Sequence, residues 1–172
     1  MKDLKTLLEG SLLADVEDTL DYGDREIIKI EIRNFIKDNY KPCNITISDK
    51  PNKDGKYEVS CKESVSISNK DIISFTNGLF IWKYVKQDFD CRFCNSLVSL
   101  EGAPETIGRG FYFGCCKKLK SLDGFPKKIG FFNKNNSVIW AVGLNKKLIN
   151  IIRDREKLNQ ICEIPEQITI MS

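Results

Sequence analysis

Two successive stretches of the chain repeat the same pattern of residues at a constant spacing of 22 positions. The matched pairs are Phe89/Phe111, Cys94/Cys116, Leu97/Leu119, Leu100/Leu122, Gly102/Gly124, Pro104/Pro126 and Ile107/Ile129, and no gap interrupts them. A unit this short cannot bury its own apolar face, but stacked units bury a continuous core. The repeat therefore predicts a solenoid, and no other feature constrains the fold as strongly.

Apolar residues alternate with other residues at the start of each repeat unit. This two-residue period is typical of a strand with one buried face. The residues expected to point inward are Phe89, Cys91, Leu97, Leu100 and Ile107 in the first unit, with Phe111 and Phe113 in the second. The intervening residues Asp90, Arg92, Tyr112 and Gly114 are then expected to point outward.

A less regular copy of the pattern precedes these two units. Val65 and Ile67 match its first strand, 73–75 matches 98–100, and Val85 matches Ile107. After residue 130 the pattern fades, and we expect the last strand of the solenoid to begin at Phe131 and Phe132.

The repeat region resembles the leucine-rich-repeat superfamily, whose units of about 20–29 residues carry Asn or Cys after the strand. Cys94 and Cys116 occupy that place here. The Ser-Leu-x-Gly-x-Pro pattern is similar to short repeats of proteins encoded by bacteriophages and gut bacteria. The resemblance covers residues 65–130 and implies a solenoid with a binding role. It transfers no catalytic residue, because a fold alone does not define a function.

The segments around the repeats predict helices and a β-hairpin. Apolar residues from Leu4 to Val16 recur at helical spacing, and a second helix is expected from an N-cap at Asp24 to Tyr40, before Pro42. Strands are expected at 44–48 and 57–61 around a turn at 52–55. One helix over 144–158 and a short strand at 168–170 complete the chain.

These elements predict an α+β protein with a short leucine-rich-repeat-like β-solenoid. Residues 1–42 form an N-terminal helical cap or arm, and 43–64 form a hairpin that leads into the solenoid at 65–136. Residues 137–172 form a C-terminal helical cap. Pairing between copies through the solenoid edges would give a homo-oligomer.

The composition argues against an enzyme. The chain contains no histidine, which removes Ser-His-Asp and Cys-His catalysis and every histidine-containing metal site. No glycine-rich phosphate loop follows a strand, because Gly108 and Gly110 lie between repeat units. We therefore expect a non-enzymatic protein without a cofactor.

The seven cysteines allow two interpretations. Cys91, Cys94, Cys115 and Cys116 could supply four thiolates for zinc. However, the repeat aligns Cys91 with Phe113 and Cys115 with Phe93, which indicates residues that fill space in a core. Core packing is favoured over zinc binding, and redox chemistry is the remaining alternative.

Other classes of partner are weakly supported. Lys117, Lys118, Lys120, Lys127 and Lys128 suggest nucleic-acid binding, but neighbouring acids dilute their charge. No apolar run approaches the ~18 residues of a membrane-spanning helix, and no secretory signal is apparent at the start. We expect a cytoplasmic protein, in the host cytoplasm if a phage encodes it, with the virion as the alternative location.

The outward strand residues suggest a function. Arg and Tyr are typical of the residues that dominate protein interfaces. The first hypothesis is a protein-binding module whose strand face presents Asp90, Arg92, Tyr112 and Gly114. The second is a structural or accessory component of a phage particle, and the third is a zinc-binding or nucleic-acid-binding module.

Overall fold

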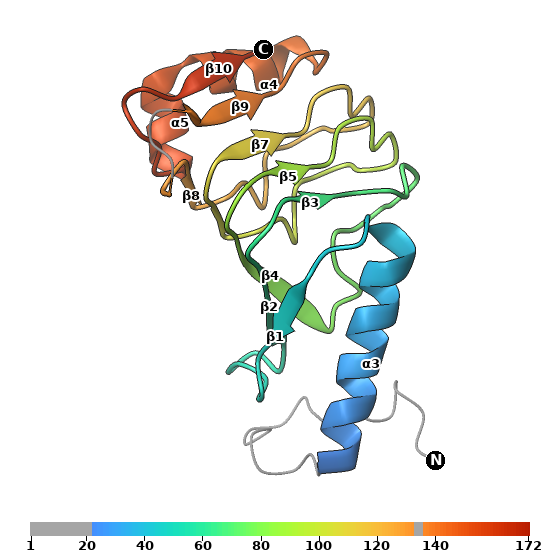
Figure 1. The fold of residues 1–172 in the computed structure, drawn as a ribbon. Helices are drawn as coiled ribbons and strands as arrows, with labels where there is room; N and C mark the ends of the chain where they lie inside the picture. Colours follow the sequence, from blue (N-terminus) through green and yellow to red (C-terminus); the bar gives the residue numbers. More distant parts are fainter. Residues whose placement is uncertain (1–21, 133–135) are drawn as a thin grey trace.

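The computed structural model describes residues 22–132 and 136–172 and shows a mixed α+β fold (Figure 1). A helix precedes a short β-solenoid of about three turns, and two helices follow it. The predicted first helix, Leu4 to Val16, lies outside the described residues. In chain order the elements are α3 (Tyr22–Asn39), β1 (Ile45–Ile47), β2 (Tyr57–Cys61), β3 (Val65–Ser66), β4 (Phe80–Val85), β5 (Phe89–Asp90), β6 (Thr106–Ile107), β7 (Gly110–Tyr112), β8 (Lys128–Ile129), β9 (Val138–Trp140), α4 (Lys146–Arg153), α5 (Arg155–Ile161) and β10 (Thr169–Met171).

The solenoid is built from two five-stranded sheets. Sheet 1 has the order β1-β2-β4-β6-β8, and sheet 2 has the order β10-β9-β7-β5-β3. From β2 to β9 the strands of the two sheets alternate along the chain, so each turn of the solenoid, here called a rung, gives one strand to each sheet. A leucine-rich repeat instead combines its strand with a helical segment. All neighbouring strands pair in parallel except β1 and β2.

Strand pairing confirms the repeat and its register. Phe89 lies opposite Phe111 in sheet 2, and Ile107 lies opposite Ile129 in sheet 1. The less regular copy is also confirmed, because Val65 pairs with Phe89 and Val85 with Ile107. Each residue predicted to point inward is at most 1% exposed: Phe89, Cys91, Leu97, Leu100, Ile107, Phe111 and Phe113.

The prediction that the last strand begins at Phe131 was wrong. That strand is β9, in which Ile139 lies opposite Phe111, so the spacing grows from 22 to 28 residues. Phe131 and Phe132 are more than half exposed and precede β9. Because six additional residues precede β9, this strand does not fall at the constant 22-residue spacing. Periodicity alone therefore does not locate it.

The rungs of β5, β7 and β9 turn the chain through a left-handed backbone conformation three residues after the strand in sheet 2. The residues in this position are Phe93 with φ 64°, Cys115 with φ 59° and Gly143 with φ 78°. Only glycine adopts this conformation without a steric cost. Phe93 and Cys115 adopt this conformation because hydrogen bonds to the next rung hold the turn. The Phe93 N–H, for example, donates to the Gly114 carbonyl at 3.1 Å.

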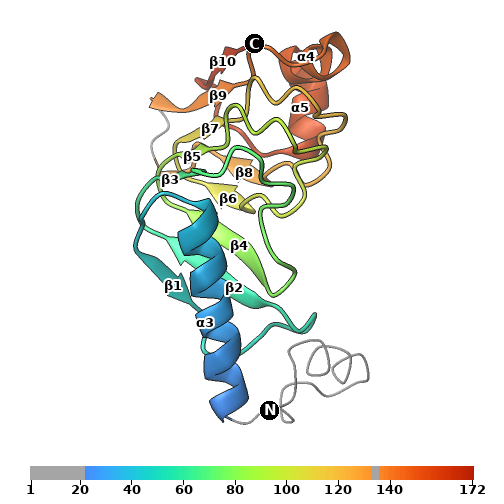
Figure 2. The same ribbon diagram turned by 90° about the vertical axis from the view of Figure 1, so that its right-hand side faces the viewer.

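Helix α3 and the hairpin cover the N-terminal end of the solenoid (Figure 2). The expected Asp24 N-cap was wrong, because α3 begins at Tyr22 and places Asp24 in its first turn. The helix continues through Gly23 because burial of its apolar stripe offsets the cost of about 1 kcal/mol for one glycine. The hairpin is confirmed by antiparallel pairing, with Ile45 opposite Cys61.

Tyr40 fastens the end of α3 to the core of the solenoid. Its hydroxyl donates to the Phe75 carbonyl at 2.6 Å and accepts from Trp82 Nε1 at 3.2 Å. The rings of Tyr40 and Trp82 meet edge to face at 5.5 Å. Tyr40 also bridges to Ile67, so the residues after α3 cover the outer edge of β3. Trp82 is therefore a core residue.

The C-terminal cap consists of two helices where one was expected. Asp154 ends α4 and begins α5, because its carboxylate accepts the Lys157 N–H at 3.2 Å. A side chain that satisfies the backbone in this way favours a helix start over continuation of the preceding helix. Leu148, Ile152 and Leu158 pack into the core. The predicted last strand is confirmed as β10, which pairs with β9.

Within the described ranges, no helix is both long and apolar enough to cross a bilayer.

Candidate functional site on the outer face of sheet 2

Three outward side chains line up across neighbouring strands of sheet 2. Asp90 in β5 lies opposite Tyr112 in β7, and Tyr112 lies opposite Trp140 in β9. Arg92 follows β5 in the turn and comes back over the same surface. All four side chains are partly exposed. We call Asp90, Arg92, Tyr112 and Trp140 the arginine–aromatic cluster.

Asp90 holds the Arg92 side chain in one orientation. Arg92 Nε donates to Asp90 Oδ1 at 2.9 Å, and Nη2 donates to Oδ2 at 2.6 Å. The Arg92 backbone N–H donates to the same Oδ1 at 3.0 Å. A bidentate pair of this kind fixes direction as well as distance. The guanidinium is therefore held in place by a residue of its own rung.

Two aromatic rings face the same guanidinium. The central carbon of the Arg92 guanidinium lies 5.2 Å from the centre of the Tyr112 ring and 5.4 Å from that of Trp140. Both distances are within the range of cation–π attraction, each worth about 0.5–1 kcal/mol at an exposed site. Three successive rungs thus contribute to one ordered surface.

The carboxyl of Asp90 stays ionised to a lower pH than usual. Burial raises its pKa, but hydrogen bonds from the Arg92 side chain and backbone, together with the guanidinium charge, outweigh burial and lower it. Burial and the negative charge of Asp88 raise the pKa of the Tyr112 hydroxyl. At neutral pH the cluster therefore presents a neutral tyrosine beside a closed ion pair.

Gly114 was expected on the exposed surface, but it is buried. A Cβ atom at this position would point outward and meet Trp140 Cζ3 at 2.3 Å. The indole of Trp140 therefore covers Gly114. The absence of a side chain at Gly114 gives the ring the space in which it faces Arg92.

A second ion pair borders the cluster. Arg109 Nε donates to Asp88 Oδ1 at 2.8 Å, and Nη2 of Arg109 also bonds to this carboxylate. The Tyr112 ring leans over Gly110, where a Cβ would meet Tyr112 Cε2 at 2.5 Å. Tyr112 thus lies between the Asp88–Arg109 and Asp90–Arg92 pairs.

The sequence did not indicate Trp140 as part of this surface. It is partly exposed and lies opposite Tyr112. The six additional residues before β9 hide its match to Asp90 and Tyr112. The one available signal is the alternation in Val138–Trp140 itself, where Ile139 is the buried member.

The lysines considered for nucleic-acid binding do not gather into one isolated positive surface. Lys127 Nζ lies 2.7 Å from a Glu105 carboxylate oxygen, and Lys128 Nζ lies 2.9 Å from Glu163. Both therefore join ion pairs beside sheet 1. The other three, Lys117, Lys118 and Lys120, are exposed on the segment that follows β7.

The cysteines considered for zinc binding lie mainly in the core. Cys91, Cys94 and Cys116 are at most 1% exposed. Burial raises the pKa of all three thiols, to about 12 for Cys94 and about 11 for Cys116. Cys115 is partly exposed, and its thiol is 3.6 Å from the Val142 carbonyl. Among the described residues, no group of three or more potential ligands could hold a metal ion.

The fold and this surface together define an α+β protein in which a short β-solenoid presents an ordered arginine–aromatic surface. Neither protein-family models, nor curated protein sequences, nor solved structures give a significant match to the chain.

Proposed function

We propose that this chain is a non-enzymatic protein-binding module that contacts its partner through the arginine–aromatic cluster. The observation that supports this most directly is the position of Arg92, which is bonded twice to Asp90 and faces the rings of Tyr112 and Trp140. Arg, Tyr and Trp are the residues most enriched among those that dominate binding energy at protein interfaces.

The order of the cluster before binding favours this role. A flexible arginine loses about 0.5–1.5 kcal/mol of rotamer entropy when an interface immobilises it. Here the Asp90 bonds and two rings already restrict Arg92, and the rings stand on paired strands. The partner would therefore bind a surface that is already ordered, so binding would cost little further side-chain entropy. We expect it to offer apolar or aromatic side chains to the rings.

The resemblance of the repeats to those of bacteriophage-encoded proteins suggests where the partner is found. A phage-encoded module of this kind would act on a host protein in the host cytoplasm. Pairing of copies through β1 and β10, each one edge strand of its sheet, stays a prediction, and size-exclusion chromatography with light scattering would test it.

The test is a pull-down from lysate of the native host, with mass-spectrometric identification of bound proteins. The disabling variant is Arg92→Ala with Tyr112→Ala. The matched control is Lys83→Ala with Tyr84→Ala, which removes one cation and one tyrosine from the outer side of sheet 1. We expect one protein to bind the wild type and the control, and to lose at least tenfold in affinity for the disabling variant.

Other outcomes would redirect the proposal. Equal recovery by all three proteins would show that the binding surface lies elsewhere. If nothing binds, and mass spectrometry detects the chain in purified phage particles, the particle-component hypothesis would replace the proposal.

A further inference from the structure

Cys43 and Cys61 form a pair of thiols beside the hairpin. Ile45 lies opposite Cys61 in the β1–β2 register, and strand alternation places Cys43 on the same face as Ile45. The two thiols interact, because each shifts the pKa of the other. Although they are 18 positions apart in the chain, Cys43 and Cys61 are therefore neighbours on one face of the hairpin.

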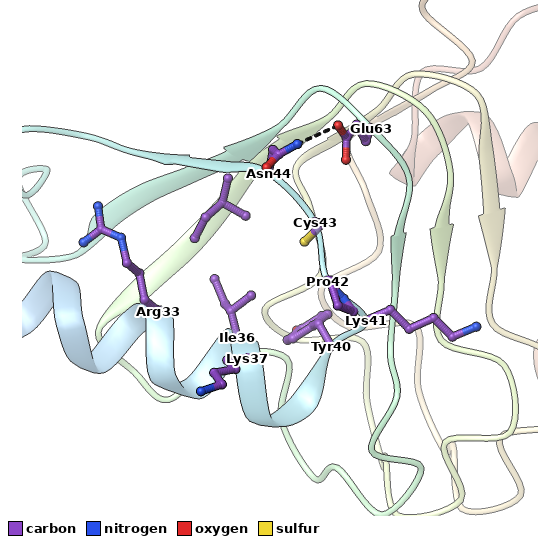
Figure 3. A pocket seen from close by; sticks show the side chains of 10 residues that line it. Arg33, Ile36, Lys37, Tyr40, Lys41, Pro42, Cys43, Asn44 and Glu63 are labelled. Carbon is purple, nitrogen blue, oxygen red and sulfur yellow. Dashed lines mark hydrogen bonds between the residues drawn. The ribbon is translucent and has the colours of Figure 1, made fainter.

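The two thiols differ in their access to solvent. Cys43 is partly exposed and lines a pocket of about 440 Å³ between α3 and the hairpin. Figure 3 shows its sulfur turned into this space. Cys61 is 1% exposed. A small reagent would therefore reach Cys43 first, and Cys61 could react only through Cys43.

The surroundings make Cys61 a good second nucleophile. The hydrogen bond from Cys43 lowers the pKa of the Cys61 thiol to about 7, because it and the Glu63 N–H, 3.4 Å from the sulfur, outweigh burial. The same thiol–thiol bond raises the pKa of Cys43. The hydrogen bond thus favours the proton on Cys43 and the thiolate on Cys61.

The pocket is lined by cationic side chains. Arg33 and Lys37 come from α3, and Lys41 comes from the connection to the hairpin (Figure 3). Glu63 is the one acid among the lining residues, and it accepts a hydrogen bond from Asn44 at 2.9 Å. An anionic reagent would therefore be attracted to Cys43.

We propose that Cys43 and Cys61 form a thiol–disulfide exchange site that a small anionic disulfide of the glutathione type oxidises to an intramolecular disulfide. The Cys43 sulfur attacks one sulfur of the reagent as its proton passes to Cys61. The reagent's S–S bond breaks, and the first small thiolate leaves and takes that proton. The Cys61 thiolate then attacks Cys43 Sγ and releases the second small thiolate. In total the thiol–thiolate pair of the protein loses two electrons and one proton, and the reagent leaves as one thiol and one thiolate.

The product would join the segment after α3 to the first parallel strand of sheet 1. Exchange through a mixed disulfide is the ordinary route for such reactions, and its rate depends on access and on thiolate content. Cys43 supplies access and Cys61 supplies the thiolate. This site lies at the N-terminal end of the solenoid and does not depend on the arginine–aromatic cluster.

The first test treats the reduced full-length protein with glutathione disulfide and maps disulfides by mass spectrometry. We expect one internal link, between Cys43 and Cys61. The Cys61→Ala variant should instead retain glutathione on Cys43, and Cys43→Ser should leave Cys61 unmodified. Cys115→Ser is the matched control, because Cys115 is the other partly exposed cysteine, and it should behave as wild type. Circular dichroism verifies that each variant is folded.

A link between other cysteines, or modification confined to Cys115, would overturn the proposal. The role of charge is tested by Lys37→Glu, an exposed substitution on α3. We expect a several-fold slower reaction with glutathione disulfide and an unchanged rate with the neutral hydroxyethyl disulfide. Equal slowing with both reagents would show that the cationic lining does not select an anionic reagent.

Discussion

The two sheets of the solenoid share one core, but their outer faces differ in chemistry. On sheet 2, Arg92 is held by Asp90 and faces two aromatic rings. Beside sheet 1, Lys83 lies 3.2 Å from both Glu58 and Glu105, and Lys127 also pairs with Glu105. Both surfaces connect successive rungs, one through rings and a planar cation and the other through flexible chains.

This difference shows which residues the repeat constrains. Stacking requires apolar residues inside every rung, and it places no such demand on the outside. The exposed Lys–Glu pairs contribute about 0–1 kcal/mol each and keep the surface polar. Partly exposed aromatic rings around an immobilised arginine are not needed for solubility. Sheet 2 is therefore the better candidate for recognition.

The largest predicted effect comes from the core that both sheets share. Phe111 is fully buried, and its ring centre lies 4.6 Å from that of Phe113 and 5.5 Å from that of Phe125. Phe111→Ala should lower the free energy of unfolding by about 3–5 kcal/mol, because it leaves a cavity between rungs. Urea unfolding followed by circular dichroism measures this.

Phe131→Ala is the matched control, since Phe131 is 52% exposed. It should cost less than about 1 kcal/mol. Similar losses for the two variants would contradict the assignment of Phe111 to the interior of the solenoid and of Phe131 to its surface.

A smaller effect is expected where sheet 2 makes room for Trp140. In Gly114→Ala the new Cβ would lie 2.3 Å from Trp140 Cζ3 and 2.4 Å from the Val142 carbonyl oxygen. The Val142 contact is with backbone, so the turn itself must shift. We expect a loss of about 1–3 kcal/mol in unfolding free energy and a changed tryptophan fluorescence spectrum.

Gly110→Ala provides the comparison on the same sheet. The atoms nearest to its Cβ would be the ends of the Tyr112 and Asp88 side chains, at 2.5 and 2.8 Å, and these can rotate away. The substitution should therefore cost less than Gly114→Ala. An equal or larger cost would show that Trp140 does not depend on Gly114 for its position.

The interior of the solenoid could be predicted from the sequence because stacking repeats one physical requirement every 22 residues. The same regularity gave three of the four members of the arginine–aromatic cluster, as residues between inward positions. Trp140 was missed because the additional residues before β9 break the spacing on which the prediction depended. Arg92 was predicted as an outward residue, but its contacts with two other rungs depend on side-chain directions that spacing does not contain.

Features set by tertiary contacts were not predictable. The left-handed turns at Phe93 and Cys115 carry no glycine or asparagine signal, because hydrogen bonds to the next rung impose the conformation. That Cys43 and Cys61 are neighbours can be inferred only once the register of the hairpin is known. Asp154 divides the C-terminal cap through one capping bond that competes with apolar spacing typical of a single helix.

The smallest predicted effect compares one carboxylate from each surface. The pKa of Asp90 is lowered for the reasons given above, and hydrogen bonds from Lys127 and Lys83 lower that of Glu105 against the opposing effect of burial. A carboxyl with a lowered pKa in the folded state contributes stability above its ordinary pKa of about 4, and this is lost as the pH falls through the folded-state value. Asp90→Asn and Glu105→Gln should each remove less than about 1 kcal/mol at neutral pH and almost nothing in strong acid.

Salt should then separate the two surfaces. The Lys127 side chain that pairs with Glu105 is 72% exposed, whereas the Asp90 carboxylate is 22% exposed and its arginine is held by two rings. Screening acts most strongly on exposed charges. Urea unfolding from pH 3 to 7, in low and high salt, should show that the cost of Glu105→Gln shrinks with added salt while that of Asp90→Asn largely persists. If salt reduced both costs equally, Arg92 would be as mobile as the lysines of sheet 1, and the argument for a pre-ordered binding surface on sheet 2 would fail.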